Sequence, residues 1–195
     1  MTIFFDTETT GLRPGQIAQL SYVMQSGGEI KAKNFFFAVS SMDYSAFLVH
    51  GFSKEKLFYL SNGKTFGDYI DEIEKDFCSA DLVCAHNTSF DFMFMRAEFE
   101  RQGKVFSVKN EFCSMKKLTP VCKLLRSSGG YKYPKLEQAC MHFGITSEHI
   151  REQSKLIFGA EADFHDARFD TTALCLLMNY AVKGVDSFRC LEEFL

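Results

Sequence analysis

Two acidic side chains near the start of the chain have a spacing suited to metal chemistry. Asp6 and Glu8 follow a short apolar run, residues 3–5, that predicts a buried strand. Residues two apart on a strand point to the same face, so these carboxylates would lie side by side and repel each other. A divalent cation such as Mg²⁺ or Mn²⁺, which prefers oxygen ligands, would remove that conflict. Solvated acids in a polar turn are the alternative interpretation of this pair alone.

A third carboxylate follows a second apolar run. Residues 82–85 predict another short buried strand. Thr88 or Ser89 would cap the helix predicted over about 89–103, and Asp91 lies in the first turn of that helix. By itself, an acid at this position would merely complement the helix dipole. Its place just beyond a strand would also allow it to meet the first acidic pair.

A histidine and a fourth carboxylate belong to the last predicted helix, residues 164–181. His165 lies near the start of this helix and Asp170 follows five residues later. Five residues turn a helix by about 500°, which leaves the two side chains about 140° apart. Both can therefore reach one site only if His165 lies at the helix edge or in the preceding loop. A surface histidine and a surface aspartate are the alternative.

The three clusters together resemble a known set of motifs. They read D-x-E-T-T-G at 6–11, H-N-x-x-F-D at 86–91 and H-x-A-x-x-D at 165–170. This order is similar to that of the DEDDh, or DnaQ-like, 3′→5′ exonucleases, a family that includes proofreading subunits of bacterial DNA polymerases. The resemblance covers about residues 2–182. It implies an α/β, ribonuclease H-like fold with a mixed sheet of about five strands flanked by helices.

The resemblance also implies a role for each matched position. Four acids resemble metal ligands and, together with the general base His165, the catalytic set: Asp6, Glu8, Asp91 and Asp170. The implied cofactors are two Mg²⁺ or Mn²⁺ ions. Five further positions resemble, more loosely, the surroundings of a terminal nucleotide: Thr9, His50, His86, Asn87 and Phe90.

The implied reaction is metal-dependent hydrolysis from the 3′ end of single-stranded or frayed DNA, with release of nucleoside monophosphates. Two metal ions can activate water and neutralise charge on the attacking and leaving oxygens. An unperturbed histidine titrates near pH 6.5, so a neutral imidazole is available to accept a proton at neutral pH. An exoribonuclease that trims RNA ends is the first alternative, and a non-catalytic nucleic-acid-binding or polymerase-accessory module is the second. Roles in DNA proofreading or DNA repair, and a polymerase or repair partner, stay open.

Composition is typical of one globular domain. The chain has 195 residues, of which 46% are hydrophobic and 24% charged. We expect an exonuclease domain over 1–182 and a tail over 183–195 that either packs on the domain or docks a partner. The 22 phenylalanines, without any tryptophan, are expected to fill the core.

A basic run stands out against the net charge of −3. Residues 101–135 contain nine lysines and arginines and only one acid, Glu111. Such a run is either a solvated face or a track for the phosphates of an incoming strand. The second interpretation fits a nucleic-acid partner, and the resemblance implies that DNA is favoured over RNA.

The cysteines and the chain start favour a cytoplasmic protein without a membrane partner. The seven cysteines include no C-x-x-C pair, which favours reduced thiols. A strand is predicted at once, without a signal peptide, and no apolar run reaches membrane-spanning length.

Further elements are expected between the motifs. Two strands, 17–24 and 33–39, would be joined by a hairpin around Gly27 and Gly28. Apolar spacing predicts three further helices over 66–77, 115–125 and 136–143.

Overall fold

The computed structural model describes residues 1–194, except for the side chains at positions 190, 193 and 194. Five strands form one mixed sheet in the order β3-β2-β1-β4-β5. They are β1 (Thr2–Thr9), β2 (Ile17–Ser26), β3 (Glu29–Phe36), β4 (Leu82–Ala85) and β5 (Glu111–Cys113). The central strand β1 is antiparallel to β2 and parallel to β4. This confirms the expected α/β class with a five-stranded mixed sheet.

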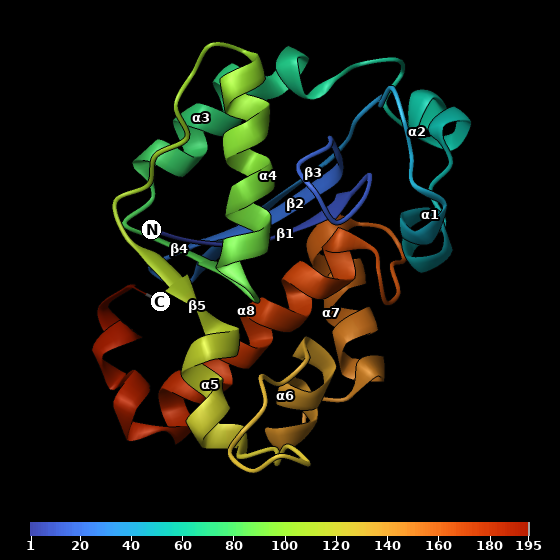
Figure 1. Cartoon of the computed structure of the whole chain (residues 1–195). Helices are drawn as coiled ribbons and strands as arrows, with labels where there is room; N and C mark the ends of the chain where they lie inside the picture. Colours follow the sequence, from blue (N-terminus) through green and yellow to red (C-terminus); the bar gives the residue numbers. More distant parts are fainter. Residues whose placement is uncertain (195) are drawn as a thin grey trace.

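Helices cover both faces of the sheet. The α-helices are α1 (Tyr44–His50), α2 (Lys54–Leu60), α3 (Ile70–Ser79), α4 (Thr88–Arg101), α5 (Ser114–Cys122), α6 (Leu136–His142), α7 (Ser147–Phe158) and α8 (Ala167–Gly184). Two 3₁₀ helices are η1 (Phe66–Tyr69) and η2 (Asp186–Phe194). In Figure 1, α3 and α4 lie above the sheet and α8 runs below it. None of the helices described is long and apolar enough to cross a bilayer.

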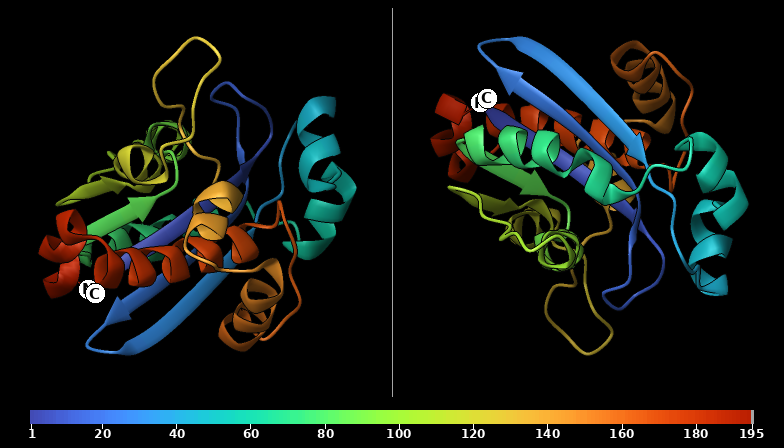
Figure 2. Two further views of the ribbon diagram at one scale, coloured as in Figure 1. Left: turned by 90° about the horizontal axis from the view of Figure 1, so that it is seen from below. Right: turned by 90° about the horizontal axis from the view of Figure 1, so that it is seen from above.

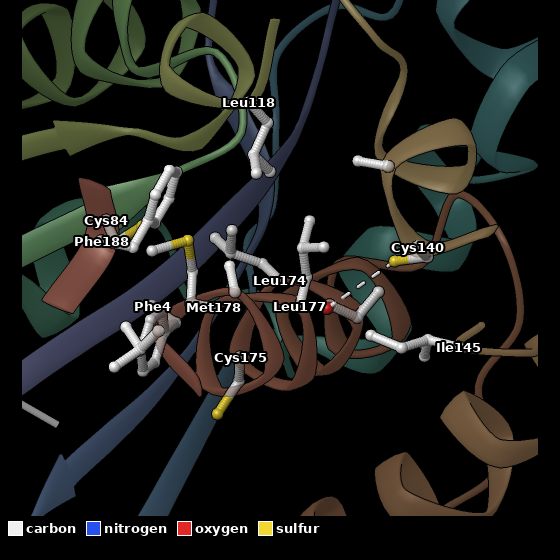
Figure 3. Close-up of a cluster of buried hydrophobic side chains, with 14 of the residues drawn as sticks. Phe4, Cys84, Leu118, Cys140, Ile145, Leu174, Cys175, Leu177, Met178 and Phe188 are labelled. Atoms are coloured by element: carbon white, nitrogen blue, oxygen red, sulfur yellow. Dashed lines mark hydrogen bonds between the residues drawn. The ribbon is translucent and has the colours of Figure 1, made fainter. Parts of the chain in front are cut away.

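The alternation of side chains along β1 explains why two separate cores form. Ile3 and Phe5 join the cluster under α3 and α4, whereas Phe4 joins the cluster around α8. The ring of Phe5 lies 5.3 Å from that of Phe77 and 5.7 Å from that of Phe92, measured between centroids. Figure 3 shows the second core, where the apolar side chains of α8 face Phe4. Many of the phenylalanines are indeed core residues, as expected.

The β2–β3 hairpin begins its second strand earlier than predicted. Gly27 and Gly28 have φ angles of 56° and 84°, which other residues rarely adopt, and they form a two-residue turn. The turn pairs Ser26 directly with Glu29, so β3 spans Glu29–Phe36 and the prediction of 33–39 is wrong at both ends.

Three predicted helix ends also shift. The helix predicted from 164 begins at Ala167, because His165 has a left-handed φ of 61° and cannot continue a helix. The helix predicted over 115–125 ends at Cys122, two residues after Pro120, and Lys123 turns out of it with φ 50°. Neither Thr88 nor Ser89 caps α4, because the helix already includes both and the left-handed Asn87 precedes it.

The last segment packs on the domain. Phe188 and Leu191 of η2 are buried in the cluster around α8, and the ring of Phe188 lies 5.6 Å from that of Phe112. These contacts join η2 to the core around α8. Leu195 lies outside the described residues.

Candidate active site

Strand β1 presents the first two acids on the face of the sheet that α8 covers. Asp6 and Glu8 share the parity of Phe4, which belongs to the core around α8. Glu8 is buried, and Asp6 is partly buried. The intervening Thr7 points to the opposite face, toward α4. A register irregularity between Glu8 and Thr9 ends the regular pairing of β1 with β2 at this point.

Helix α4 brings in the third carboxylate from the other side of the sheet. Asp91 lies in the first turn of α4 and is buried. The hydroxyl of Thr7 donates a hydrogen bond of 2.8 Å to Asp91 Oδ1. This bond joins α4 to the residue between the two acids of β1, so Asp91 is held at the same strand end.

The turn before α8 allows His165 and Asp170 of the third motif to reach one site. His165 precedes the first helical residue, Ala167. Because its backbone is left-handed, its side chain does not follow the angular spacing of the helix. Its backbone also hydrogen-bonds the Asp170 carboxylate. As a result, the ligand atoms of Glu8, His165 and Asp170 lie within 4.8 Å of one another. Within residues 1–194 this is the one set of three that could hold a metal ion at that spacing, and it does not include Asp6 or Asp91.

Asp6 and Asp91 interact electrostatically with the carboxylates of that set. Burial is the main cause that raises the pKa of Asp6 well above its usual range, and repulsion from Asp170, Asp91 and Glu8 adds to it. Burial, followed by Asp170, raises the pKa of Glu8 in the same direction.

The remaining two carboxylates titrate near neutrality. Burial raises the pKa of Asp91 to about 7, against the opposing effect of the Thr7 hydrogen bond. Burial likewise raises the pKa of Asp170 to about 7, although the backbone hydrogen bond from His165 opposes it.

A divalent cation fits this donor set. Across the described part of the chain, no lysine or arginine forms an ion pair with Asp6, Glu8, Asp91 or Asp170. Four carboxylates gathered at low exposure without a cationic partner destabilise one another when ionised. Hard oxygen donors of this kind suit Mg²⁺ or Mn²⁺.

A buried glutamine that no sequence pattern singled out joins α8 to the sheet. Gln19 of β2 is paired with Glu8 and is fully buried. Its amide N–H donates to Asp166 Oδ1 at 2.9 Å, and its Oε1 accepts from the backbone N–H of Ala167 at 3.1 Å. Asp166 in turn caps α8 and pairs with Arg168. This contact fixes the turn that carries His165 against the strand beside Glu8.

A cavity of about 320 Å³ opens beside the acids. Three of the five positions predicted near a terminal nucleotide line it, together with Glu8: Thr9, His50 and Phe90. His50 Nδ1 accepts from the N–H of Phe52, so its proton lies on Nε2, which donates to the Thr9 carbonyl at 3.2 Å. Burial lowers the pKa of His50, in keeping with this neutral form.

The other two predicted positions do not line this cavity. His86 hydrogen-bonds the Ser114 hydroxyl at 2.8 Å and donates to the Pro134 carbonyl at 3.0 Å. Burial lowers its pKa to about 4, so the ring is neutral, and it joins the start of α5 to the segment before α6. Asn87 forms the left-handed turn into α4.

Gly11, the last residue of the first motif, lines the same cavity, and so does Leu12, which was not predicted as a site residue. A Cβ atom at Gly11 would lie 2.2 Å from Asp43 Oδ2, so a larger residue at this position would require the Asp43 side chain to move.

Comparisons with known proteins show which family this chain resembles. A model of the exonuclease family RNase_T matches residues 3–177. The chain is 30% identical over 153 residues to the DNA polymerase III subunit epsilon of Salmonella typhimurium, covering 73% of this chain and 60% of that protein. It is 27% identical over 202 residues to the PolC-type DNA polymerase III of Bacillus subtilis, covering 98% of this chain but 12% of that protein.

Among solved structures, Escherichia coli Exonuclease I in complex with an oligonucleotide shares the fold. The TM-score is 0.73 at 15% identity, covering 96% of this chain and 41% of that chain. The chain thus spans 60% or less of the length of each of these three relatives, and the family match over residues 3–177 contains all three motifs. On the match over residues 3–177, this chain belongs to the RNase_T family of DEDD, or DnaQ-like, exonucleases.

Proposed function

We propose that this protein hydrolyses phosphodiester bonds from the 3′ end of single-stranded or frayed DNA and releases nucleoside monophosphates. One observation carries the proposal: four carboxylates that form no ion pair with a lysine or arginine of the described residues lie close enough to repel one another, and one of them, Glu8, lines a cavity of about 320 Å³. The acids supply a metal site, and the cavity supplies room for a chain end.

In this proposal Asp6, Glu8, Asp91 and Asp170 hold two Mg²⁺ or Mn²⁺ ions. Bound there, the ions would supply activation of water and neutralisation of charge on the phosphate. The raised pKa values of the four acids support this assignment, because a bound dication would favour the ionised carboxylates that burial disfavours.

His165 is proposed as the general base that accepts a proton from the attacking water. Its exposed position at the edge of the acid cluster supports this role, because the imidazole can exchange its proton with solvent. The Gln19–Asp166 contact would hold the turn of His165 in place during the reaction.

The cavity is proposed to bind the terminal nucleotide. Phe90, Leu12 and Val49 offer apolar surface for a base, while Thr9 and His50 offer polar groups. Its volume lies at the small end of the range for ligand cavities. A site of that size supports removal of one nucleotide at a time from an end.

The similar proteins described above favour DNA over RNA as the substrate. Those described above are subunits or forms of DNA polymerase III, and the similar solved structure holds an oligothymidylate. The same relatives support a replication or repair setting with a polymerase partner. An RNA-trimming role is the competing outcome of the test below.

The test compares matched DNA and RNA oligomers, single stranded and duplex, each labelled at the 5′ end. The proposal expects a ladder that shortens from the 3′ end, faster on single-stranded DNA than on RNA. Activity should require Mg²⁺ or Mn²⁺ and disappear in excess EDTA. Faster RNA shortening would assign the RNA role, and full activity in EDTA would contradict the metal site.

A further inference from the structure

A strongly basic segment of the chain forms no ion pairs with the acids that the structure describes. Residues 114–135 hold six of the 22 lysines and arginines and none of the 25 acids, in a chain of net charge −3. The six are exposed: Lys116, Lys117, Lys123, Arg126, Lys132 and Lys135. Throughout the part of the chain that the structure describes, none of them forms an ion pair.

The structure divides the basic run expected over 101–135 into two parts. Its first three cations are used internally, since Arg101 pairs with Glu98, Lys104 with acids of α3, and Lys109 with Asp81. Only the second part, from Lys116 onward, remains available to an outside partner.

Much of this second part forms a hairpin, which we call the basic hairpin and define as residues 123–135. The N–H of Lys132 donates to the Leu124 carbonyl at 2.8 Å, and the N–H of Arg126 donates to the Gly130 carbonyl at 3.0 Å. Gly129 and Gly130 have positive φ angles and make the turn. The chain therefore projects outward and returns on itself.

The returning limb of the basic hairpin displays two aromatic rings. Tyr131 and Tyr133 are 42% and 52% exposed, and the guanidinium of Arg126 lies 6.0 Å from the ring of Tyr133. Exposed rings interleaved with lysine and arginine match the surface that binds single-stranded nucleic acid, where bases stack on the rings and phosphates meet the cations.

The basic hairpin is connected to the candidate active site. Pro134, at its base, accepts the hydrogen bond from His86, four residues before Phe90 of the cavity. Both views in Figure 2 show the basic hairpin and the loop after β1, which carries Gly11 and Leu12, projecting from the same side of the molecule. A strand that leaves the cavity on this side would run toward the hairpin.

We propose that the basic hairpin binds single-stranded DNA on the 5′ side of the terminal nucleotide. Arg126 and Lys132 contact phosphates, and Tyr131 and Tyr133 stack on bases. The proposal rests on the proposed function, because it takes the terminal nucleotide to occupy the cavity beside the acids.

Binding of a fluorescent 12-residue oligothymidylate, measured by anisotropy in EDTA, tests the contacts without turnover. The variants are Arg126→Ala/Lys132→Ala and Tyr131→Ala/Tyr133→Ala. A matched control is Lys31→Ala/Lys75→Ala, which removes two exposed cations elsewhere. We expect the charge pair to lower the slope of log affinity against log salt by about 1.4. The tyrosine pair should weaken binding roughly 10- to 100-fold, and the control should bind as the wild type does.

Turnover on long and short strands separates this proposal from the proposed function. The ratio of kcat/KM on the 12-mer to kcat/KM on a dinucleotide should fall about tenfold in both hairpin variants. Active wild type with an unchanged ratio and unchanged binding in the variants would overturn the hairpin proposal alone. A wild type that neither binds nor cleaves any strand would overturn both. If the Tyr131→Ala/Tyr133→Ala variant does not fold, the Arg126→Ala/Lys132→Ala variant, which changes only exposed side chains, tests the hairpin proposal.

Discussion

Removing one carboxylate from the acid cluster should stabilise the metal-free protein, by an amount that grows as the pH rises from about 4 to 7 and then levels off. Asp170→Asn keeps the shape of the side chain and an oxygen that can accept the backbone hydrogen bond from His165. What it removes is a negative charge that burial and its neighbours oppose. A substitution that abolishes activity is therefore expected to increase stability.

The size of the effect follows from the pKa of Asp170, which is raised from 3.8 to about 7. A raised pKa means that the folded chain holds more protons than the unfolded chain between these two values, so stability falls as pH rises across that window. Full ionisation at pH 8 costs the folded state up to about 4 kcal/mol relative to the unfolded state. Because neighbouring acids share this effect, the measured gain for Asp170→Asn should be roughly 2–4 kcal/mol at pH 8 and close to zero at pH 4.

Urea unfolding in EDTA at several pH values measures this gain. Asp71→Asn, which changes a carboxylate that is 90% exposed, is the control and should show no comparable rise in stability with pH. Mn²⁺ at pH 8 should raise the stability of wild type more than that of Asp170→Asn. A gain that is absent at pH 8, or equal at pH 4 and pH 8, would refute the argument from buried like charges.

Three further substitutions test other parts of the site. His165→Ala should lower turnover by roughly 10²–10⁴-fold and leave Mn²⁺ affinity largely intact; a loss of affinity as large as that of Asp170→Asn would make the histidine a ligand and not a base. Thr7→Val removes the 2.8 Å bond to Asp91, so calorimetry should find weaker Mn²⁺ binding and a stability loss of about 1 kcal/mol. Gln19→Leu leaves the N–H of Ala167 unpaired, which should reduce stability by roughly 1–3 kcal/mol and lower kcat; an unchanged kcat would show that the glutamine does not position the turn of His165.

Local patterns predicted the parts of the fold that depend on neighbouring residues. The apolar run at 82–85 matches β4, and the Gly27-Gly28 turn matches the hairpin, because strand burial and two-residue turns are encoded within a few positions. Helix ends were harder to predict. Nothing in the apolar spacing around Ala167 reveals that Asp166 caps the helix there and that the backbone turns left-handed one residue earlier.

The candidate site likewise has some features that local sequence patterns predict and others that depend on distant residues. The shared face of Asp6 and Glu8 follows from strand geometry, and the condition that His165 precede the helix is met by the turn. The contact between Gln19 and Asp166 joins residues 147 apart in sequence, so no local pattern could predict it. The sequence motif around His86 does not indicate whether its ring faces the cavity or the Pro134 carbonyl. In the folded structure the ring faces the Pro134 carbonyl.

The most direct test of the central claim is a crystal structure with Mn²⁺ and thymidine monophosphate, recorded with anomalous data. The account predicts two Mn²⁺ peaks among Asp6, Glu8, Asp91 and Asp170, with the phosphate beside them and the base in the cavity lined by Phe90 and His50. Peaks elsewhere, or a nucleotide bound away from this cavity, would contradict it.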